Sequence, residues 1–169
     1  MEAADHRERG AVLGPYCKRS PVNRLDDPNL LVSHDDVGSF ENRIVVAGSR
    51  SYNNYGEFDY VMQRLMSKCD KSNCVIISGD ALDGPDAMSI HWAKANGWKY
   101  SRRAADWDKY KKAAGFIRNA EMKKDATRVI VFWDLESRGS WHMFSISDAD
   151  KSIKTTLIIV YPDNTPYAQ

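Results

Sequence analysis

The feature that most constrains the fold is a series of short apolar runs that alternate with stretches of helical spacing. Clear runs, rich in β-branched residues, occupy 44–47, 74–77, 129–133 and 157–161, and 98–100 is a weaker candidate. Strands that are apolar along their whole length are buried on both faces, as in parallel sheets covered by helices. The sequence therefore predicts an α/β, Rossmann-like three-layer fold with a mostly parallel five-stranded sheet and helices on both faces.

The stretches between these runs have the spacing of amphipathic helices. Pro85 and Gly97 are typical of the first turn and the C-terminal cap of the second helix. Gly115 falls inside the third helix, where glycine is about 1 kcal/mol less favourable than alanine, and so indicates close backbone packing or a bend. The sequence predicts helices over about 58–69, 85–96, 106–124 and 140–150.

The sequence divides near residue 42. Residues 1–41 show no sustained periodicity and predict an extended or partly disordered N-terminal arm, whereas 42–169 form the predicted Rossmann-like domain. No apolar run approaches the ~18 residues needed to cross a bilayer, and the N-terminus lacks a secretory pattern. The three cysteines have no C-x-x-C spacing, so neither a metal site nor a disulfide framework is expected. We expect a cytoplasmic protein.

The charge distribution leaves two interpretations open. The net charge is only +1, but residues 99–124 hold nine basic and three acidic side chains. Such a run is either a solvated helix face or a surface that attracts a phosphate-bearing partner. Composition alone favours the solvated face.

Polar, glycine-containing loops follow the first, second and fourth predicted strands, at 44–47, 74–77 and 129–133. Ligands of open parallel sheets bind beyond the carboxyl ends of the strands, where these loops would lie. After the first strand, Gly48 allows close approach of backbone N–H groups to an anion, Ser49 offers a hydroxyl and Arg50 a guanidinium fork. Neither a G-x-G-x-x-G fingerprint nor a Walker loop is present.

The loop after the second strand leads into a helix N-terminus, which favours a phosphate. Ser78, Gly79 and Gly84 would shape this loop. Asp86 either caps the helix or accepts hydrogen bonds from a ribose or a base.

The loop after the fourth strand is a second candidate anion site ahead of a helix. Trp133 precedes it and is a candidate for stacking on a base. Arg118 and Asn119 would contribute if their helix directs them toward the strand ends. The candidate anion contacts in this loop are Ser137, Arg138, Gly139 and Ser140.

Taken together and in sequence order, these loops and the segments around them resemble a known family, the YspA-like (cpYpsA-related) branch of the SLOG superfamily. The resemblance rests on residues 47–50, 78–79 with Gly84 and Asp86, 105–107, 114–122, 132–134 and 137–143. It implies a Rossmann-like fold that binds nucleotide-derived ligands, in a family common in bacteria and phages. Its relatives include Lonely Guy phosphoribohydrolases, which cleave nucleoside monophosphates, and DprA-type proteins that bind single-stranded DNA.

The chain departs from the family pattern in the second loop. Asp80 replaces a glycine and Asp83 adds a carboxylate, and both would repel a phosphate. The Pro-Gly-Gly-x-Gly-Thr motif of Lonely Guy enzymes is absent, so their catalytic residues are not carried over.

Together these observations favour binding of a phosphate-bearing nucleotide or an ADP-ribose-like molecule by a homo-oligomer, with no membrane association. An N-glycoside hydrolase or transferase acting on nucleotides is the first alternative, although no carboxylate stands out among Asp80, Asp86, Asp134 and Glu136. The second alternative is single-stranded nucleic-acid binding by the basic stretch, with stacking on Trp98, Tyr100, Trp107 and Tyr110.

Overall fold

The computed structural model describes residues 25–161, in which five strands form one parallel sheet. All pairings are parallel, so the predicted Rossmann-like fold is confirmed, with a sheet that is wholly parallel rather than mostly so. The order across the sheet is β3-β2-β1-β4-β5. The strands are β1 (Asn42–Gly48), β2 (Cys74–Ser78), β3 (Lys99–Arg102), β4 (Arg128–Trp133) and β5 (Lys154–Ile159).

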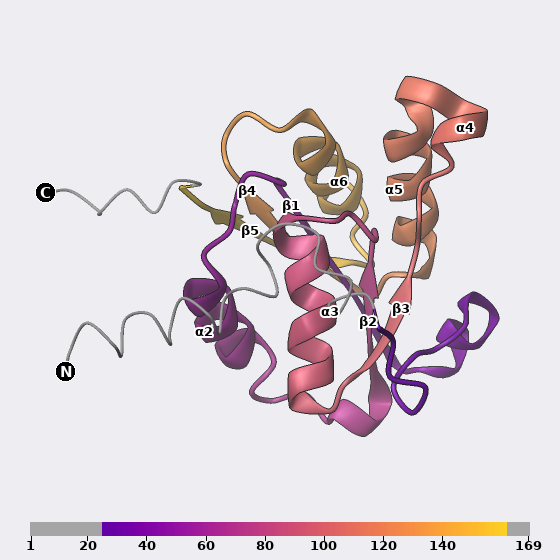
Figure 1. The fold of residues 1–169 in the computed structure, drawn as a ribbon, viewed down its shortest axis with the longest axis vertical. Helices are drawn as coiled ribbons and strands as arrows, with labels where there is room; N and C mark the ends of the chain where they lie inside the picture. Colours follow the sequence, from indigo (N-terminus) through magenta and orange to yellow (C-terminus); the bar gives the residue numbers. More distant parts are fainter. Residues whose placement is uncertain (1–24, 162–169) are drawn as a thin grey trace, which may run out of the picture.

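Helices cover both faces of the sheet, as Figure 1 shows. One face packs against α2 (Tyr55–Leu65) and α3 (Gly84–Asn96), and the other against α5 (Ala114–Asp125) and α6 (Arg138–Asp148). Between residues 25 and 161, no helix combines the length and the apolar character needed to span a bilayer.

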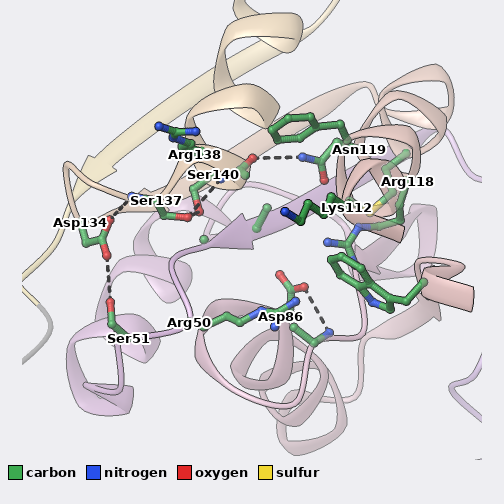
Figure 2. Close-up of a pocket in the computed structure, with 18 residues that line it drawn as sticks. Arg50, Ser51, Asp86, Lys112, Arg118, Asn119, Asp134, Ser137, Arg138 and Ser140 are labelled. Atoms are coloured by element: carbon green, nitrogen blue, oxygen red, sulfur yellow. Dashed lines mark hydrogen bonds between the residues drawn. The ribbon is translucent and has the colours of Figure 1, made fainter. Parts of the chain in front are cut away.

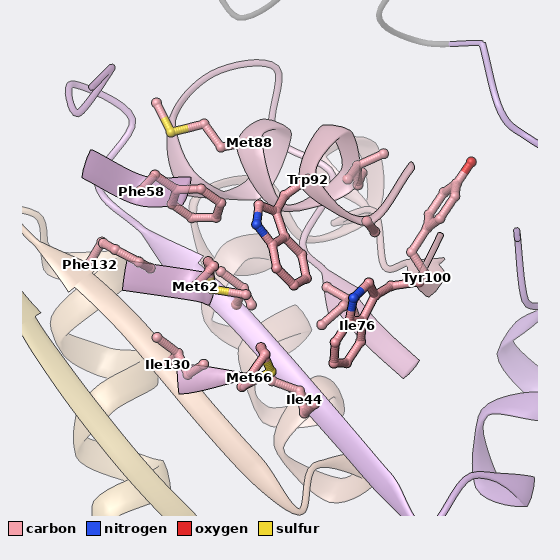
Figure 3. Packing of buried hydrophobic residues seen from close by; sticks show 14 of the residues in the cluster. Ile44, Phe58, Met62, Met66, Ile76, Met88, Trp92, Tyr100, Ile130 and Phe132 are labelled. Atoms are coloured by element: carbon pink, nitrogen blue, oxygen red, sulfur yellow. The ribbon is translucent and has the colours of Figure 1, made fainter. Parts of the chain in front are cut away.

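Each layer has its own apolar core because side chains of a strand alternate between the two faces. On the first face, Phe58 of α2 and Trp92 of α3 are fully enclosed (Figure 3). On the opposite face, Met122 of α5 and Met143 of α6 pack on the alternate strand residues. Burial on both faces explains why the strands read as continuous apolar runs.

The strand order reverses between β1 and β4. From β1 the chain proceeds outward through β2 to β3, and then returns to the other side of β1 to add β4 and β5. The two central strands stay paired to their ends, where the amide of Ser49 donates to the Phe132 carbonyl at 2.9 Å. The loops that follow them then diverge, and such a reversal is where open α/β sheets bind ligands.

The predicted single helix over 106–124 is wrong. The chain forms a short helix α4 (Trp107–Tyr110), a 3-10 turn η5 (Lys111–Ala113) and then α5. Asp106 caps α4 by accepting from the Lys109 amide at 3.0 Å, and Lys111 leaves the helical region with a φ of 52°. Apolar spacing does not reveal a single residue of this kind, so the sequence suggested one continuous helix.

Residues 25–41, the described part of the predicted arm, pack on the domain. Leu31 forms a bridge to Tyr100 beside β3, and Val37 in the turn η3 (His34–Ser39) is buried. Residues 1–24 lie outside the described part of the chain.

Two aromatic residues of the basic stretch belong to the core. Trp98 is 7% exposed and Tyr100 is fully buried, so neither offers the stacking surface that the sequence suggested. The Tyr100 side chain packs in the core on the α2–α3 face, and its backbone pairs with Leu30 and Val32 at the outer edge of β3.

Candidate functional site

A pocket of about 460 Å³ lies at the reversal of the strand order, over the carboxyl ends of β1 and β4 (Figure 2). Four segments far apart in the sequence form its walls: the loop after β1, the start of α3 with its preceding loop, the α4–α5 region, and the loop that leads into α6. The lining residues are Ala47, Gly48, Arg50, Ser51, Ala81, Asp86, Trp107, Lys112, Gly115, Phe116, Arg118, Asn119, Met122, Asp134, Ser137, Arg138, Gly139 and Ser140.

The loop after β1 is tightly packed. A Cβ on Gly48 would lie 2.5 Å from the Phe132 carbonyl oxygen, which only glycine avoids. Ser49 is buried beneath the pocket, where its hydroxyl accepts from the Asp134 amide at 3.1 Å. Arg50 is exposed and lines the pocket, with its guanidinium 5.8 Å from the centroid of the Trp107 ring.

The β2–α3 loop supports the site from below. Ser78 is buried and donates to the Asp86 carbonyl at 2.8 Å, while the Gly79 carbonyl accepts from Arg118. Gly84 has a φ of +72° and touches the loop after β1, since a Cβ there would lie 2.7 Å from the Ser49 carbonyl oxygen. These three residues shape the pocket without lining it.

Asp86 lines the pocket although it is only 6% exposed. It does not cap α3, because its carboxylate accepts from the amide of Ala81, in the preceding loop, at 3.3 Å. Burial raises the pKa of Asp86 above its ordinary value, although Arg118, the Ala81 amide and Arg50 oppose the shift. The same carboxyl therefore carries a proton over a wider pH range than an exposed one.

The two extra acidic residues of the β2–α3 loop do not line the pocket. The Asp80 carboxylate forms an ion pair with Arg102 of β3 at 2.5 Å. Asp83 occupies the N-cap position of α3 without a side-chain capping bond. The repulsion of phosphate expected from Asp80 is thus reduced by Arg102.

The loop before α6 is organised around Asp134. Its carboxylate accepts from the amides of Ser137 at 2.8 Å and Glu136 at 2.9 Å, and from the Ser51 hydroxyl at 2.9 Å. Burial would raise the pKa of Asp134, but these hydrogen bonds outweigh it and hold the pKa below its ordinary value. Glu136 is exposed and does not line the pocket.

Ser137 caps α6 by accepting from the Ser140 amide at 3.4 Å. Arg138, Gly139 and Ser140 form the first turn of α6, so the helix N-terminus faces the pocket. Asn119 of α5 joins the two helices by donating to the Gly139 carbonyl at 3.0 Å.

Trp133 does not line the pocket. Its indole N–H donates to the Ser137 carbonyl at 3.0 Å, and its ring packs on Trp141 with centroids 4.6 Å apart. Trp133 thus fixes the loop before α6 from behind.

The structure brings most predicted site residues together. Those that line the pocket are Gly48, Arg50, Asp86, Arg118, Asn119, Asp134, Ser137, Arg138, Gly139 and Ser140. Those that do not line it are Ser49, Ser78, Gly79, Asp80, Gly84, Trp133 and Glu136.

Sequence reasoning missed Lys112 and Phe116, and assigned Trp107 to a nucleic-acid surface rather than to this pocket. The predicted continuous helix hid them, because the break at Lys111 is what turns this region over the strand ends. The repeated basic and aromatic residues of 107–116 were the available signal.

The pocket is predominantly cationic. Two carboxylates line it, those of Asp86 and Asp134, and the Asp86 carboxyl has a raised pKa. Within residues 25–161, none of the lining cations has a carboxylate at ion-pairing distance. These cations are Arg50, Lys112, Arg118 and Arg138.

Comparison with known protein families finds a match over the first part of the domain. Residues 42–110 match the family described as YAcAr: YspA, cpYpsA-related SLOG family. The resemblance inferred from the motifs is confirmed over residues 42–110, which include the loop after β1, the β2–α3 loop and α4. The motifs at 114–122, 132–134 and 137–143 lie outside this match.

The fold is similar to that of a solved structure, DNA processing protein A (DprA) from Streptococcus pneumoniae. The TM-score is 0.59 at 18% sequence identity, and the match covers 92% of this chain and 68% of that chain. At this identity the likeness concerns the fold. Comparison with curated protein sequences gives no significant match.

Proposed function

We propose that the pocket binds a phosphate-bearing nucleotide or a nucleotide-derived molecule such as ADP-ribose. The observation that carries this proposal is the convergence of four cationic side chains that lack a carboxylate at ion-pairing distance within residues 25–161. Guanidinium and ammonium groups without a carboxylate partner around one cavity favour a multiply charged anion. A cavity of about 460 Å³ falls within the usual range for small-molecule sites.

The two sides of the pocket suit different parts of such a ligand. Arg138 and the first turn of α6 offer a cation and backbone N–H groups, which bind phosphate oxygens. Asp86, when ionised, only accepts hydrogen bonds, so it favours ligand donors such as ribose hydroxyls or base amines. Arg50 and Arg118 lie close enough to influence the pKa of Asp86 and would bridge the two sides.

Isothermal titration tests the proposal. Nucleoside mono-, di- and triphosphates, ADP-ribose and ribose 5-phosphate are titrated into the wild type and into Arg50→Ala and Arg138→Ala. We expect at least one of these ligands to bind, and each variant to weaken binding about tenfold or more, as for the loss of a charge-assisted hydrogen bond.

The matched control is Arg64→Ala, on α2 outside the pocket, which should bind like the wild type. Failure of every ligand to bind the wild type would refute the proposal.

We also expect a homo-oligomer. Within residues 25–161, β5 is an edge strand, and large apolar side chains on it and on α6 are exposed, including Trp141 at 44% and Ile159 at 39%. Contiguous exposed apolar surface commonly marks a protein interface. Sedimentation velocity tests the expectation, and a monomer at micromolar concentration would contradict it.

A second candidate is hydrolysis of a nucleotide N-glycosidic bond. Two carboxyls with opposite pKa shifts line one pocket, Asp86 raised and Asp134 lowered. Pairs of this kind divide the roles of acid and carboxylate in glycoside cleavage. Release of free base from nucleoside monophosphates, abolished in Asp86→Asn, would support this function. Hydrolysis is the weaker proposal, because the Asp134 carboxylate is already occupied by hydrogen bonds from Ser51, Glu136 and Ser137.

A third candidate is binding of single-stranded nucleic acid, suggested by the structural likeness to a protein named for DNA processing. Trp107 and Tyr110 are exposed in the basic stretch and are available for stacking. Affinity for oligonucleotides that falls steeply with salt would support it.

A further inference from the structure

Two aromatic side chains line the pocket while keeping much of their surface exposed. Trp107 is 48% exposed and Phe116 is 44% exposed. By contrast, Trp92 and Trp98 of the core are 1% and 7% exposed. Large aromatic surface left open toward a polar cavity is available to a flat apolar group of a ligand.

The local backbone and the neighbouring helix α5 hold Trp107 in a defined position. It is the first residue of α4, which Asp106 caps, and the chain then reverses at Lys111. This reversal brings the Trp107 ring against α5, where a Cβ added to Gly115 would lie 3.5 Å from it. The ring therefore has support on one side.

The cationic side chains next to the Trp107 ring favour a ligand that carries a phosphate. The Arg50 guanidinium lies 5.8 Å from the centroid of the Trp107 ring, and both line the same cavity. Lys112 follows Trp107 on the same wall (Figure 2 shows Lys112 and Arg118 together). The guanidinium lies over the ring, so a planar group that stacks there takes its place and keeps these cations nearby for an attached phosphate.

We propose that Trp107 is the platform on which the base of the bound nucleotide stacks, with Phe116 as a second apolar contact. This inference rests on the proposed function and narrows it, because it requires a ligand with an aromatic base rather than a sugar phosphate alone. Stacking on an aromatic side chain is tolerant of base identity, so Trp107 confers a requirement for a base, not for one particular base.

The experiment compares ligands that differ only in the base. AMP, GMP, CMP, UMP and ribose 5-phosphate are titrated into the wild type, Trp107→Leu and Trp107→Phe. We expect at least one nucleotide to bind the wild type about tenfold or more tighter than ribose 5-phosphate, which is the magnitude of one base–aromatic stack. Trp107→Leu should remove this advantage and leave ribose 5-phosphate affinity within about twofold, whereas Trp107→Phe should retain most of it.

The matched control is Tyr60→Leu, since Tyr60 of α2 is 62% exposed and does not line the pocket. It should leave both affinities unchanged, and circular dichroism verifies the fold of each variant. If ribose 5-phosphate binds as tightly as every nucleotide, or Trp107→Leu weakens all ligands equally, the inference is wrong while the proposed function stands. Loss of a homo-oligomer in Trp107→Leu, with nucleotide affinity unchanged, would assign Trp107 to a subunit contact and overturn the inference. If no ligand of this series or of the broader series above binds the wild type, both proposals fall.

Discussion

The contact between α3 and the loop after β1 predicts that Gly84→Ala is much more damaging than Gly97→Ala. The two glycines have nearly the same φ, +72° and +71°, so each alanine incurs about 1–2 kcal/mol of left-handed strain. They differ in what the new methyl group meets. At Gly84 it would lie 2.7 Å from the Ser49 carbonyl oxygen and 2.9 Å from the Arg50 Cα, whereas at Gly97 the nearest atom is the Lys71 ammonium nitrogen at 3.5 Å.

The magnitudes follow from these neighbours. The lysine side chain at Gly97 can rotate away, so Gly97→Ala should lower the free energy of unfolding by about 1–2 kcal/mol. Backbone atoms at Gly84 cannot rotate away, and overpacking of this kind adds about 1–3 kcal/mol, for a total of roughly 2–5 kcal/mol.

Urea unfolding followed by circular dichroism measures both free energies. Because Gly84→Ala must displace the backbone of Arg50, it should also weaken nucleotide binding, whereas Gly97→Ala should not. Equal destabilisation by the two substitutions would show that the loop yields freely, and would refute the argument that Gly84 fixes the position of Arg50.

Three further predictions concern the carboxyl in the pocket, the ion pairs beneath it and the core. Between pH 3.8 and the raised folded-state pKa of Asp86, this carboxyl holds more protons in the folded than in the unfolded chain. The contribution of Asp86 to the free energy of unfolding should therefore fall as the pH rises from 3.8 through that raised pKa. Asp86→Asn should lack this component, and parallel urea-derived pH profiles for the two proteins would contradict the assignment. Arg102 bridges Asp26 and Asp80, so Arg102→Ala should speed amide hydrogen exchange in the β2–α3 loop, and unchanged exchange would argue against coupling. Trp92 is 1% exposed, so Trp92→Ala should lower the free energy of unfolding by about 3–5 kcal/mol, and a loss below about 1 kcal/mol would contradict its role in the core.

The sequence was sufficient for the sheet and for the loops that carry polar chemistry. Continuous apolar runs identify strands buried on both faces, and the carboxyl ends of parallel strands must meet at one edge. That is why Arg50 and Arg138, far apart in the sequence, were expected together and do line one pocket. The strand limits differed by a few residues, as for β3 and β5, because local pattern does not reveal where pairing ends.

The sequence was insufficient where a role depends on a distant partner. Trp133 looked like a stacking surface, yet its contact with Trp141 on α6 directs it behind the loop. Asp80 appeared as a charge facing a phosphate, and the pairing with Arg102 on β3 is invisible without the fold. The sequence places Trp107 on a nucleic-acid-binding surface and not in the pocket, because the reversal at Lys111 depends on one backbone angle that apolar spacing does not reveal.

A chain with a net charge of only +1 can still present an anion site, because local pairing matters more than the total. The acidic residues near the strand ends have their charge offset by other groups: Arg102 pairs with Asp80, and backbone amides with the Ser51 hydroxyl satisfy Asp134. Asp86 is the exception, and burial raises its pKa. The field inside the pocket is thus set by its cations at any pH where Asp86 is protonated. Ionisation of Asp86 should reduce the affinity for phosphate groups near it, while improving its capacity to accept hydrogen bonds from a ligand.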